Sequence, residues 1–298
     1  MAYYSGLATD YNDLLNSLIL ACQNESWDFS SGVLSKDIAL IRPYVSLNTS
    51  NTEDKGIVFE VASTNATTSE VRPRLGRASQ TFEIAFPVNY FFHIYDLEVW
   101  CVVKHGINEY LWAGFGVADN RVFASANARR GGNGSNIAYV MDATSGATPN
   151  DGLPWNGTSA SSCLPFWSSF TSNNGDYNQD TIQSGIDGYT WAGATQKLMA
   201  MRLNSPLIAR SPNIWNSESI LFPITPYLTV ASSKVSILAE IKHCRYLRIN
   251  NLEPEQIIQL GNEKWKIYPA VKKDSLNPNN IYGNHSGTFG MAIRYDGP

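Results

Sequence analysis

The chain has 298 residues, of which 43% are hydrophobic, 12% aromatic and only 16% charged, and its formal net charge at pH 7 is −4. Its 8 Trp, 15 Tyr and 12 Phe residues exclude an intrinsically disordered chain, and no run approaches the roughly 18 uncharged apolar residues of a membrane span. The acidic balance argues against a nucleic-acid binder, which ordinarily has a basic face. We therefore expect an ordered globule, either one large β domain or two smaller ones.

A helix is expected near the N-terminus. Thr9 can cap it, and Asp10 and Asp13 suit the positive end of a helix. Apolar residues within 11–22 mark one face at helical spacing, and the pattern ends near Asn24.

After the helix the pattern changes to that of strands. Period-two runs predict strands over 38–47 and 56–63, and the strongest β signal covers 81–117. Within that block, 99–103 and 110–115 are expected to form a hairpin across a turn at 105–108. Later strands are expected over 189–191, 197–201, 219–223, 227–230, 235–241, 246–249, 264–269 and 288–295, with a turn or single helical turn at 252–255. The fold class is mainly β, a β-sandwich or barrel-like structure with an N-terminal α-helix.

The middle of the chain differs in composition. Residues 120–188 are rich in Gly, Ser, Thr and Asn with isolated aromatic residues, which predicts a long loop-rich insertion ordered by a partner or by the β core. We expect three regions, 1–119, 120–188 and 189–298, and the first and last can form one continuous β core. The candidate interface residues of the insertion are Arg129, Arg130, Trp155, Phe166, Trp167 and Phe170.

The four cysteines are far apart and form no Cys-x-x-Cys pair, which excludes a zinc ribbon and a dense disulfide framework. Cys22, Cys101 and Cys244 lie in apolar surroundings, so we interpret them as buried free thiols. The first 15 residues lack the basic start and apolar segment of a secretory signal. We therefore expect synthesis in a reducing cytoplasm.

No catalytic motif stands out, and we expect neither an enzyme nor a bound cofactor. There is no Gly-x-Ser-x-Gly, His-Glu-x-x-His or Walker sequence. The four histidines are expected to be satisfied or exposed, although a Ser–His–Asp triad assembled from distant residues stays open. Glu83, Asp96 and Glu98 lie near one another in the strand block, as glycan cleavage requires of two carboxylates, but Glu83 occupies the outward position of an alternating strand.

Two binding patterns occur in the loop-rich region. Oxygen-bearing side chains alternate at Asn174, Asp176, Asn178 and Asp180, as in calcium loops, but the glycine and glutamate of an EF-hand are missing. An Asx-turn loop is the favoured interpretation, and a calcium site is the alternative. Trp155, Trp167 and Trp191 are candidates for stacking on sugar rings, with packing as the favoured interpretation.

Sequence landmarks occur in a fixed order along the chain: an opening helix followed by Trp, a Tyr-Phe-x-His segment with a later Gly-Phe-Gly, and two closing strands. The opening residues are Thr9, Asp10, Asp13, Leu14, Leu15 and Trp27. The middle residues are Tyr90, Phe91, Phe92, His93, Tyr110, Gly114, Phe115 and Gly116. The closing residues are Gly261, Trp265, Tyr268, Pro269, Gly290, Ala292, Ile293, Arg294 and Tyr295. In these landmarks the chain resembles a recurrent family of tailed-bacteriophage virion proteins, tail or baseplate components. Lys104, Glu109 and the 120–188 region depart from the family's pattern.

The resemblance implies a structural component of the virion, without catalysis, made in the host cytoplasm. Its expected partners are further copies of itself and other virion proteins, with no nucleic acid and no membrane span. Three alternatives stay open: a tail module that binds a receptor or a host surface glycan, a neck, collar or head-surface protein of the same particle, and a glycan-degrading enzyme.

Overall fold

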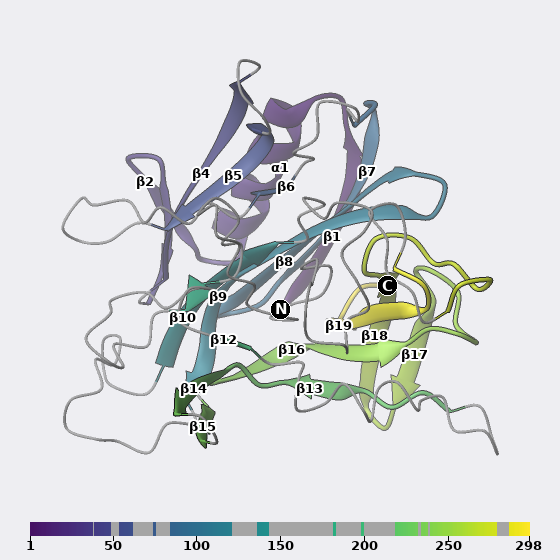
Figure 1. Cartoon of the computed structure of the whole chain (residues 1–298). Helices are drawn as coiled ribbons and strands as arrows, with labels where there is room; N and C mark the ends of the chain where they lie inside the picture. The colour runs from purple at the N-terminus through teal and green to yellow at the C-terminus, as the bar shows by residue number, and fades with distance from the viewer. Residues whose placement is uncertain are drawn as a thin grey trace.

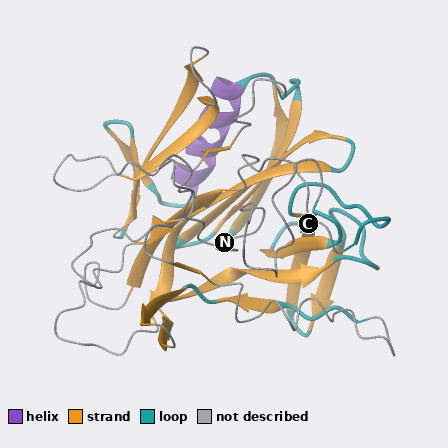
Figure 2. Ribbon diagram, in the orientation of Figure 1, coloured by secondary structure: helices purple, strands orange, loops and turns teal. Residues whose placement is uncertain are grey.

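A computed structural model of the chain describes residues 1–37, 39–48, 54–61, 74–75, 84–120, 136–142, 181–182, 198–199, 218–231, 234–237, 239–278 and 286–298. Within these ranges the protein is mainly β, with one helix, as Figure 2 shows. The expected fold class is confirmed, because a large antiparallel sheet curls into a half-barrel (Figure 1).

The large sheet joins strands from both ends of the chain. Its order is β1 (Ala2–Ala8), β7 (Val88–Ile94), β8 (Glu98–Gly106), β9 (Glu109–Asn120), β16 (Ala239–Arg248), β19 (Phe289–Tyr295), β18 (Glu263–Pro269) and β17 (Ile257–Leu260). Off this path, β10 (Asn136–Asp142) pairs with β9 and with β11 (Thr181–Ile182), and β13 (Phe222–Ile224) pairs with β16.

The sheet folds over where β9 meets β16. This joint consists of the pairs Asn120–Ala239 and Asp119–Glu240. On either side of it, β1, β7, β8 and β9 form one half, and β16, β19, β18 and β17 form the other. Apolar residues of both halves pack into one cluster, the inner core, which includes Trp100 and Trp112 from the first half and Tyr246 and Met291 from the second. The halves therefore face each other across this core.

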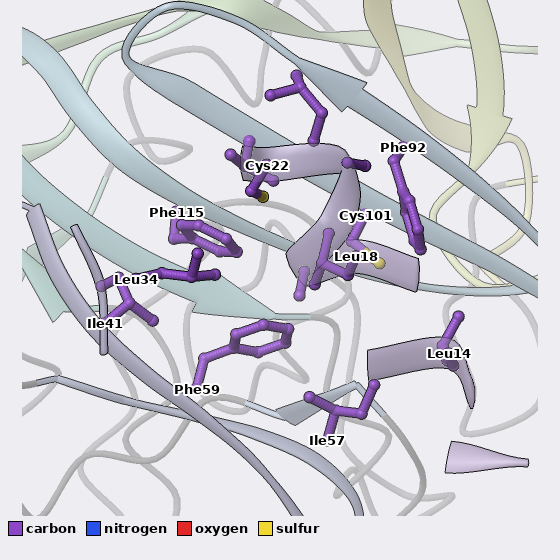
Figure 3. Packing of buried hydrophobic residues seen from close by; sticks show 14 of the residues in the cluster. Leu14, Leu18, Cys22, Leu34, Ile41, Ile57, Phe59, Phe92, Cys101 and Phe115 are labelled. Carbon is purple, nitrogen blue, oxygen red and sulfur yellow. The ribbon is translucent and has the colours of Figure 1, made fainter. Parts of the chain in front are cut away.

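A second layer covers the opposite face of the first half. Helix α1 (Tyr11–Asn24) lies between the large sheet and a five-stranded sheet of β2 (Asp28–Ser30), β3 (Val33–Lys36), β4 (Ala39–Asn48), β5 (Asp54–Val61) and β6 (Arg74–Leu75) (Figure 1). Their shared apolar cluster, the outer core, includes Leu18, Phe59 and Phe115 (Figure 3). A separate three-stranded sheet holds β12 (Leu198–Met199), β14 (Tyr227–Ala231) and β15 (Lys234–Ile237).

The helix is confirmed, but its cap is not Thr9. Asp10 is the N-cap residue, and its carboxylate accepts a hydrogen bond from the backbone N–H of Asp13 at 2.9 Å. Thr9 instead donates its own N–H and hydroxyl to the Asp13 carboxylate. The two acidic residues thus satisfy donors at the helix start reciprocally, and Leu14, Leu18, Ala21 and Cys22 form the buried face.

The predicted hairpin is confirmed as β8 and β9 around the turn at Ile107 and Asn108. Strand β8 is buried on both faces, because Trp100 and Val102 enter the inner core while Val99, Cys101 and Val103 enter the outer core. This explains why its sequence is an unbroken apolar run rather than an alternating one.

Most other predicted strands have counterparts with shifted ends. The strands expected over 38–47 and 56–63 are β4 and β5, and those at the C-terminus are β18 and β19. The predicted break before 246 is wrong, since β16 runs continuously from Ala239 to Arg248. The strands β1, β2, β3, β6, β10, β11 and β17 lie outside every predicted strand range, and β10 and β11 lie inside the region expected to be loop-rich. The strand expected over 189–191 lies outside the described residues.

Cys22, Cys101 and Cys244 are buried free thiols, as predicted. Burial raises the pKa of each thiol, so all three stay protonated at neutral pH. Their sulfur atoms therefore act as small apolar groups within the cores. Cys163 lies outside the described residues.

Candidate functional site

Polar side chains of the first half reach across the inner core to the second half. The His93 ring on β7 lies 3.0 Å from the Tyr268 hydroxyl on β18 through Nε2, and 3.2 Å from the Arg294 carbonyl on β19 through Nδ1. The Tyr95 hydroxyl donates to the same carbonyl. Because a carbonyl only accepts, Nδ1 carries the proton and Nε2 accepts from Tyr268. These contacts fix β7 against β18 and β19.

Lys266 on β18 makes a second link between the halves. Its Nζ donates to the Tyr3 hydroxyl on β1 at 2.8 Å, and it lies 4.8, 4.8 and 5.5 Å from the ring centroids of Tyr3, Phe91 and Tyr295. Burial lowers the pKa of Lys266, and the charge of Glu255 opposes this shift. The three rings provide favourable cation–π contacts for the partly desolvated ammonium group, which holds β1 to the opposite half.

Two further links lie near the β8–β9 turn. The Glu255 carboxylate accepts from Lys104 Nζ and from the Tyr110 hydroxyl, both at 2.8 Å. Glu109 accepts from Lys272 Nζ at 2.7 Å. The end of the hairpin is therefore held by charged groups of the second half, in contrast to the ring contacts around Lys266.

A buried carboxylate lies at the joint of the two halves. Glu98 on β8 is 1% exposed, and it accepts from the backbone N–H groups of Lys242 and His243, from Trp100 Nε1 and from the Tyr139 hydroxyl. His243 Nδ1 lies 3.3 Å from Glu98 Oε1, and its ring stacks on Tyr95 at 3.9 Å.

Burial and the charge of Glu98 raise the pKa of Tyr139, so that its hydroxyl stays protonated and donates. The carboxylate of Glu98 thus receives four donors and joins β8, β10 and β16. Such an arrangement anchors the sheet, because a buried charge is stabilised when hydrogen bonds satisfy its oxygens.

The two ends of the large sheet form a different kind of site. Within the described residues, β1 pairs only with β7 and β17 pairs only with β18. Their sequences, AYYSGLA and IIQL, contain neither a charged residue nor a proline. Sheet edges in natural proteins are usually protected by charges, prolines or bulges. In the part of the chain that the structure describes, both edges of this sheet are therefore open to another strand.

Exposed aliphatic side chains gather at these edges. Eight large hydrophobic residues are exposed in the described part of the chain, and four of them lie on the edge strands or directly before one. These four are Met1, Leu7, Ile257 and Leu260, with exposed fractions between 43% and 56%. We take β1 and β17 as the candidate functional site, because exposed apolar groups beside unpaired backbone are typical of contact surfaces.

The described part of the chain contains neither a metal-binding cluster nor a membrane-spanning helix. No group of three or more His, Cys, Asp and Glu side chains is placed to hold a metal ion there. The described helix is too short to cross a membrane.

None of the candidate residues named from the sequence belongs to β1 or β17. Arg129, Arg130, Trp155, Phe166, Trp167, Phe170 and Trp191, and the calcium candidates Asn174, Asp176, Asn178 and Asp180, fall outside the described residues, as do Glu83 and His285. Of the other two carboxylates, Asp96 is exposed and pairs with Lys36 at 3.3 Å, whereas Glu98 is the buried anchor.

The edge strands were not found from the sequence. A signal for them was present in the uncharged runs at residues 2–8 and 257–260, but neither run shows regular alternation.

Comparison with models of known protein families finds no match to this chain, and comparison with curated protein sequences finds none either.

Proposed function

We propose that the protein is a structural subunit of a tailed-phage virion, in the tail or baseplate, which acts by assembling with copies of itself and with neighbouring virion proteins. In this role it performs no catalysis of its own. The sequence landmarks of that family motivate the assignment.

The observation that carries the proposal is the pair of open, uncharged sheet edges with exposed aliphatic side chains. An exposed apolar edge favours pairing with another chain, and a protein that works as a monomer is under selection to block it. A subunit that is covered by neighbours has no such requirement. The composition agrees with this role, since charged residues are depleted at the centres of protein interfaces.

The links across the inner core support the same role. Hydrogen bonds of His93, Tyr95 and Lys266 join the two halves, and Glu98 anchors their joint. The halves therefore hold their edges at a fixed angle to each other. A fixed angle between contact surfaces is what a closed ring of identical subunits requires.

Two measurements on the phage that carries this gene test the proposal. Peptide mass spectrometry of purified particles should find the chain in multiple copies per particle, as a ring subunit requires. An amber mutation in the gene, grown without a suppressor, should give particles with defective tails, and plasmid-supplied wild-type protein should restore them. Intact infectious particles that lack the chain would refute the assignment.

A further inference from the structure

Strand β1 has backbone groups that point away from its neighbour. Tyr95 N–H donates to the Glu98 carbonyl at the turn between β7 and β8, and hydrogen-bonded pairs alternate along an antiparallel ladder. The backbone groups of Tyr90, Phe92 and Ile94 therefore face β1, where their partners are Gly6, Tyr4 and Ala2.

By the same alternation, the N–H and C=O groups of Tyr3, Ser5 and Leu7 face the open edge. The register of β1 against β7 is regular over all seven residues, so these groups are evenly spaced for a further antiparallel strand. Ser5 and Leu7 are exposed, and Leu7 is 56% exposed. A strand added here would cover both residues.

The sequence of β1 is complementary to itself when it is reversed. An antiparallel copy centred on Ser5 places Ser5 opposite Ser5, Tyr3 opposite Leu7, Tyr4 opposite Gly6 and Ala2 opposite Ala8. Every pair is uncharged, and the bulky side chain of each unequal pair meets a smaller one. Apolar cross-strand pairs stabilise such a contact, whereas like charges would oppose it.

We propose that β1 is a self-association surface, through which two copies of this chain pair antiparallel about a two-fold axis at Ser5. The outward groups of Tyr3, Ser5 and Leu7 then exchange six hydrogen bonds with those of the second copy. The two large sheets become one continuous sheet across the dimer. This pairing rests on the proposed function, because it specifies one copy-to-copy contact of an assembling subunit.

Disulfide trapping tests the register. In a hydrogen-bonded antiparallel pair the opposed Cα atoms are about 5.5 Å apart, which is within the range of about 4.4–6.8 Å that a disulfide needs. Ser5→Cys in a Cys163→Ser background should therefore form a covalent dimer under mild oxidation. Leu7→Cys should not, because the register separates the two copies of residue 7 by about four residues, or roughly 13 Å along the strand.

A matched pair of charge variants tests the affinity of the contact. Leu7→Lys places a charge on the edge, and Leu20→Lys places one on helix α1 at a leucine that is 59% exposed. By sedimentation velocity of the full chain over a concentration series, the wild type and Leu20→Lys should dimerise with the same dissociation constant. Leu7→Lys should dimerise at least tenfold more weakly, with an unchanged circular dichroism spectrum.

Several results would overturn the pairing. These are a monomeric wild type at every concentration, Leu7→Lys dimerising as strongly as the wild type, or Leu7→Cys crosslinking as well as Ser5→Cys. If another strand of the same chain covers β1, the Ser5→Cys protein will stay monomeric under oxidation, and this result too would overturn the pairing. If mass spectrometry finds the chain in particles while Ser5→Cys fails to crosslink, the pairing is wrong and the proposed function stands. Absence from particles contradicts the proposed function independently of the dimer.

Discussion

His93→Gln replaces a buried imidazole with an amide that retains hydrogen-bonding atoms but takes up no proton. The His93 side chain lies between the halves of the sheet, where it is 1% exposed. Burial and, to a smaller extent, the positive charge of Lys266 lower the pKa of His93, and the bond to the Arg294 carbonyl acts in the opposite direction; together they bring the pKa to about 3. The folded protein therefore holds this ring neutral throughout the mildly acidic range.

The size of the effect follows from the two pKa values. In the unfolded chain the pKa of histidine is about 6.5. Below that pH the His93 ring is protonated in the unfolded chain, whereas in the folded protein it takes up a proton only near pH 3. The contribution of the neutral His93 ring to the free energy of unfolding is therefore fully present above pH 6.5, and it is lost as the pH falls from 6.5 toward 3. Between pH 7.5 and pH 5.0, proton uptake by this one group lowers the free energy of unfolding by about 2 kcal/mol.

Urea denaturation of the wild type and of His93→Gln at pH 7.5, 6.5, 5.5 and 5.0 measures this term. All other titrating groups are common to both proteins, so the difference between the two free energies of unfolding isolates His93. Between pH 7.5 and pH 5.0 we expect the free energy of unfolding of the wild type to fall by about 2 kcal/mol relative to that of His93→Gln. Parallel pH profiles would refute the reasoning, whatever the absolute stability of the variant. Tyr268→Phe is an informative companion, because it leaves His93 Nε2 without its donor and should cost about 1–3 kcal/mol at pH 7.5.

Two further pairs of variants test the packing by thermal and urea denaturation. Gly116→Ala should destabilise by more than about 2 kcal/mol, because the φ of Gly116 is +141° and a Cβ there meets the Leu97 carbonyl; Gly261→Ala, at φ +60° in open space, should cost only about 1 kcal/mol. Equal losses would contradict the assigned clash. Leu18→Ala, which removes a fully buried side chain of α1, should cost about 2–5 kcal/mol. Leu20→Ala on the exposed face should stay within about 0.5 kcal/mol, and a large loss there would show that Leu20 is covered.

The sequence predicted the elements whose burial imposes a pattern. Helix α1 has one buried face, and its apolar residues accordingly repeat at helical spacing. Strand β8 lies between two cores and is uniformly apolar. Within the described residues, strands β1 and β17 each pair with a neighbour on one side only, and most of their residues are exposed or half-buried. Their sequences carry no period that separates them from loops, and this is why the candidate site was missed.

The links between the halves lay beyond sequence reasoning for another reason. His93 and Tyr268 are 175 residues apart, and Tyr3 and Lys266 are 263 apart. Each residue type is unremarkable at its position, and only the fold of the sheet at the β9–β16 joint brings the partners together. The landmarks of the family resemblance are mostly buried, including Trp27, His93 and Tyr268. They therefore reflect packing in the cores, and no residue of the candidate edge strands is among them.

The continuity of the large sheet across distant parts of the chain has a consequence for biosynthesis. Residues 88–120, which form β7, β8 and β9, leave the ribosome before the strands of the second half. One face of these strands stays uncovered until the second half is complete, and its last strand, β19, ends at Tyr295. At about 5–20 residues per second, the 175 residues between Asn120 and Tyr295 take roughly 9–35 s to synthesise. During that interval Trp100, Trp112 and Tyr110 lack the partners that bury them. Nascent chains should therefore depend on chaperones that shield apolar surface, and translation that stalls within this interval should favour aggregation over folding.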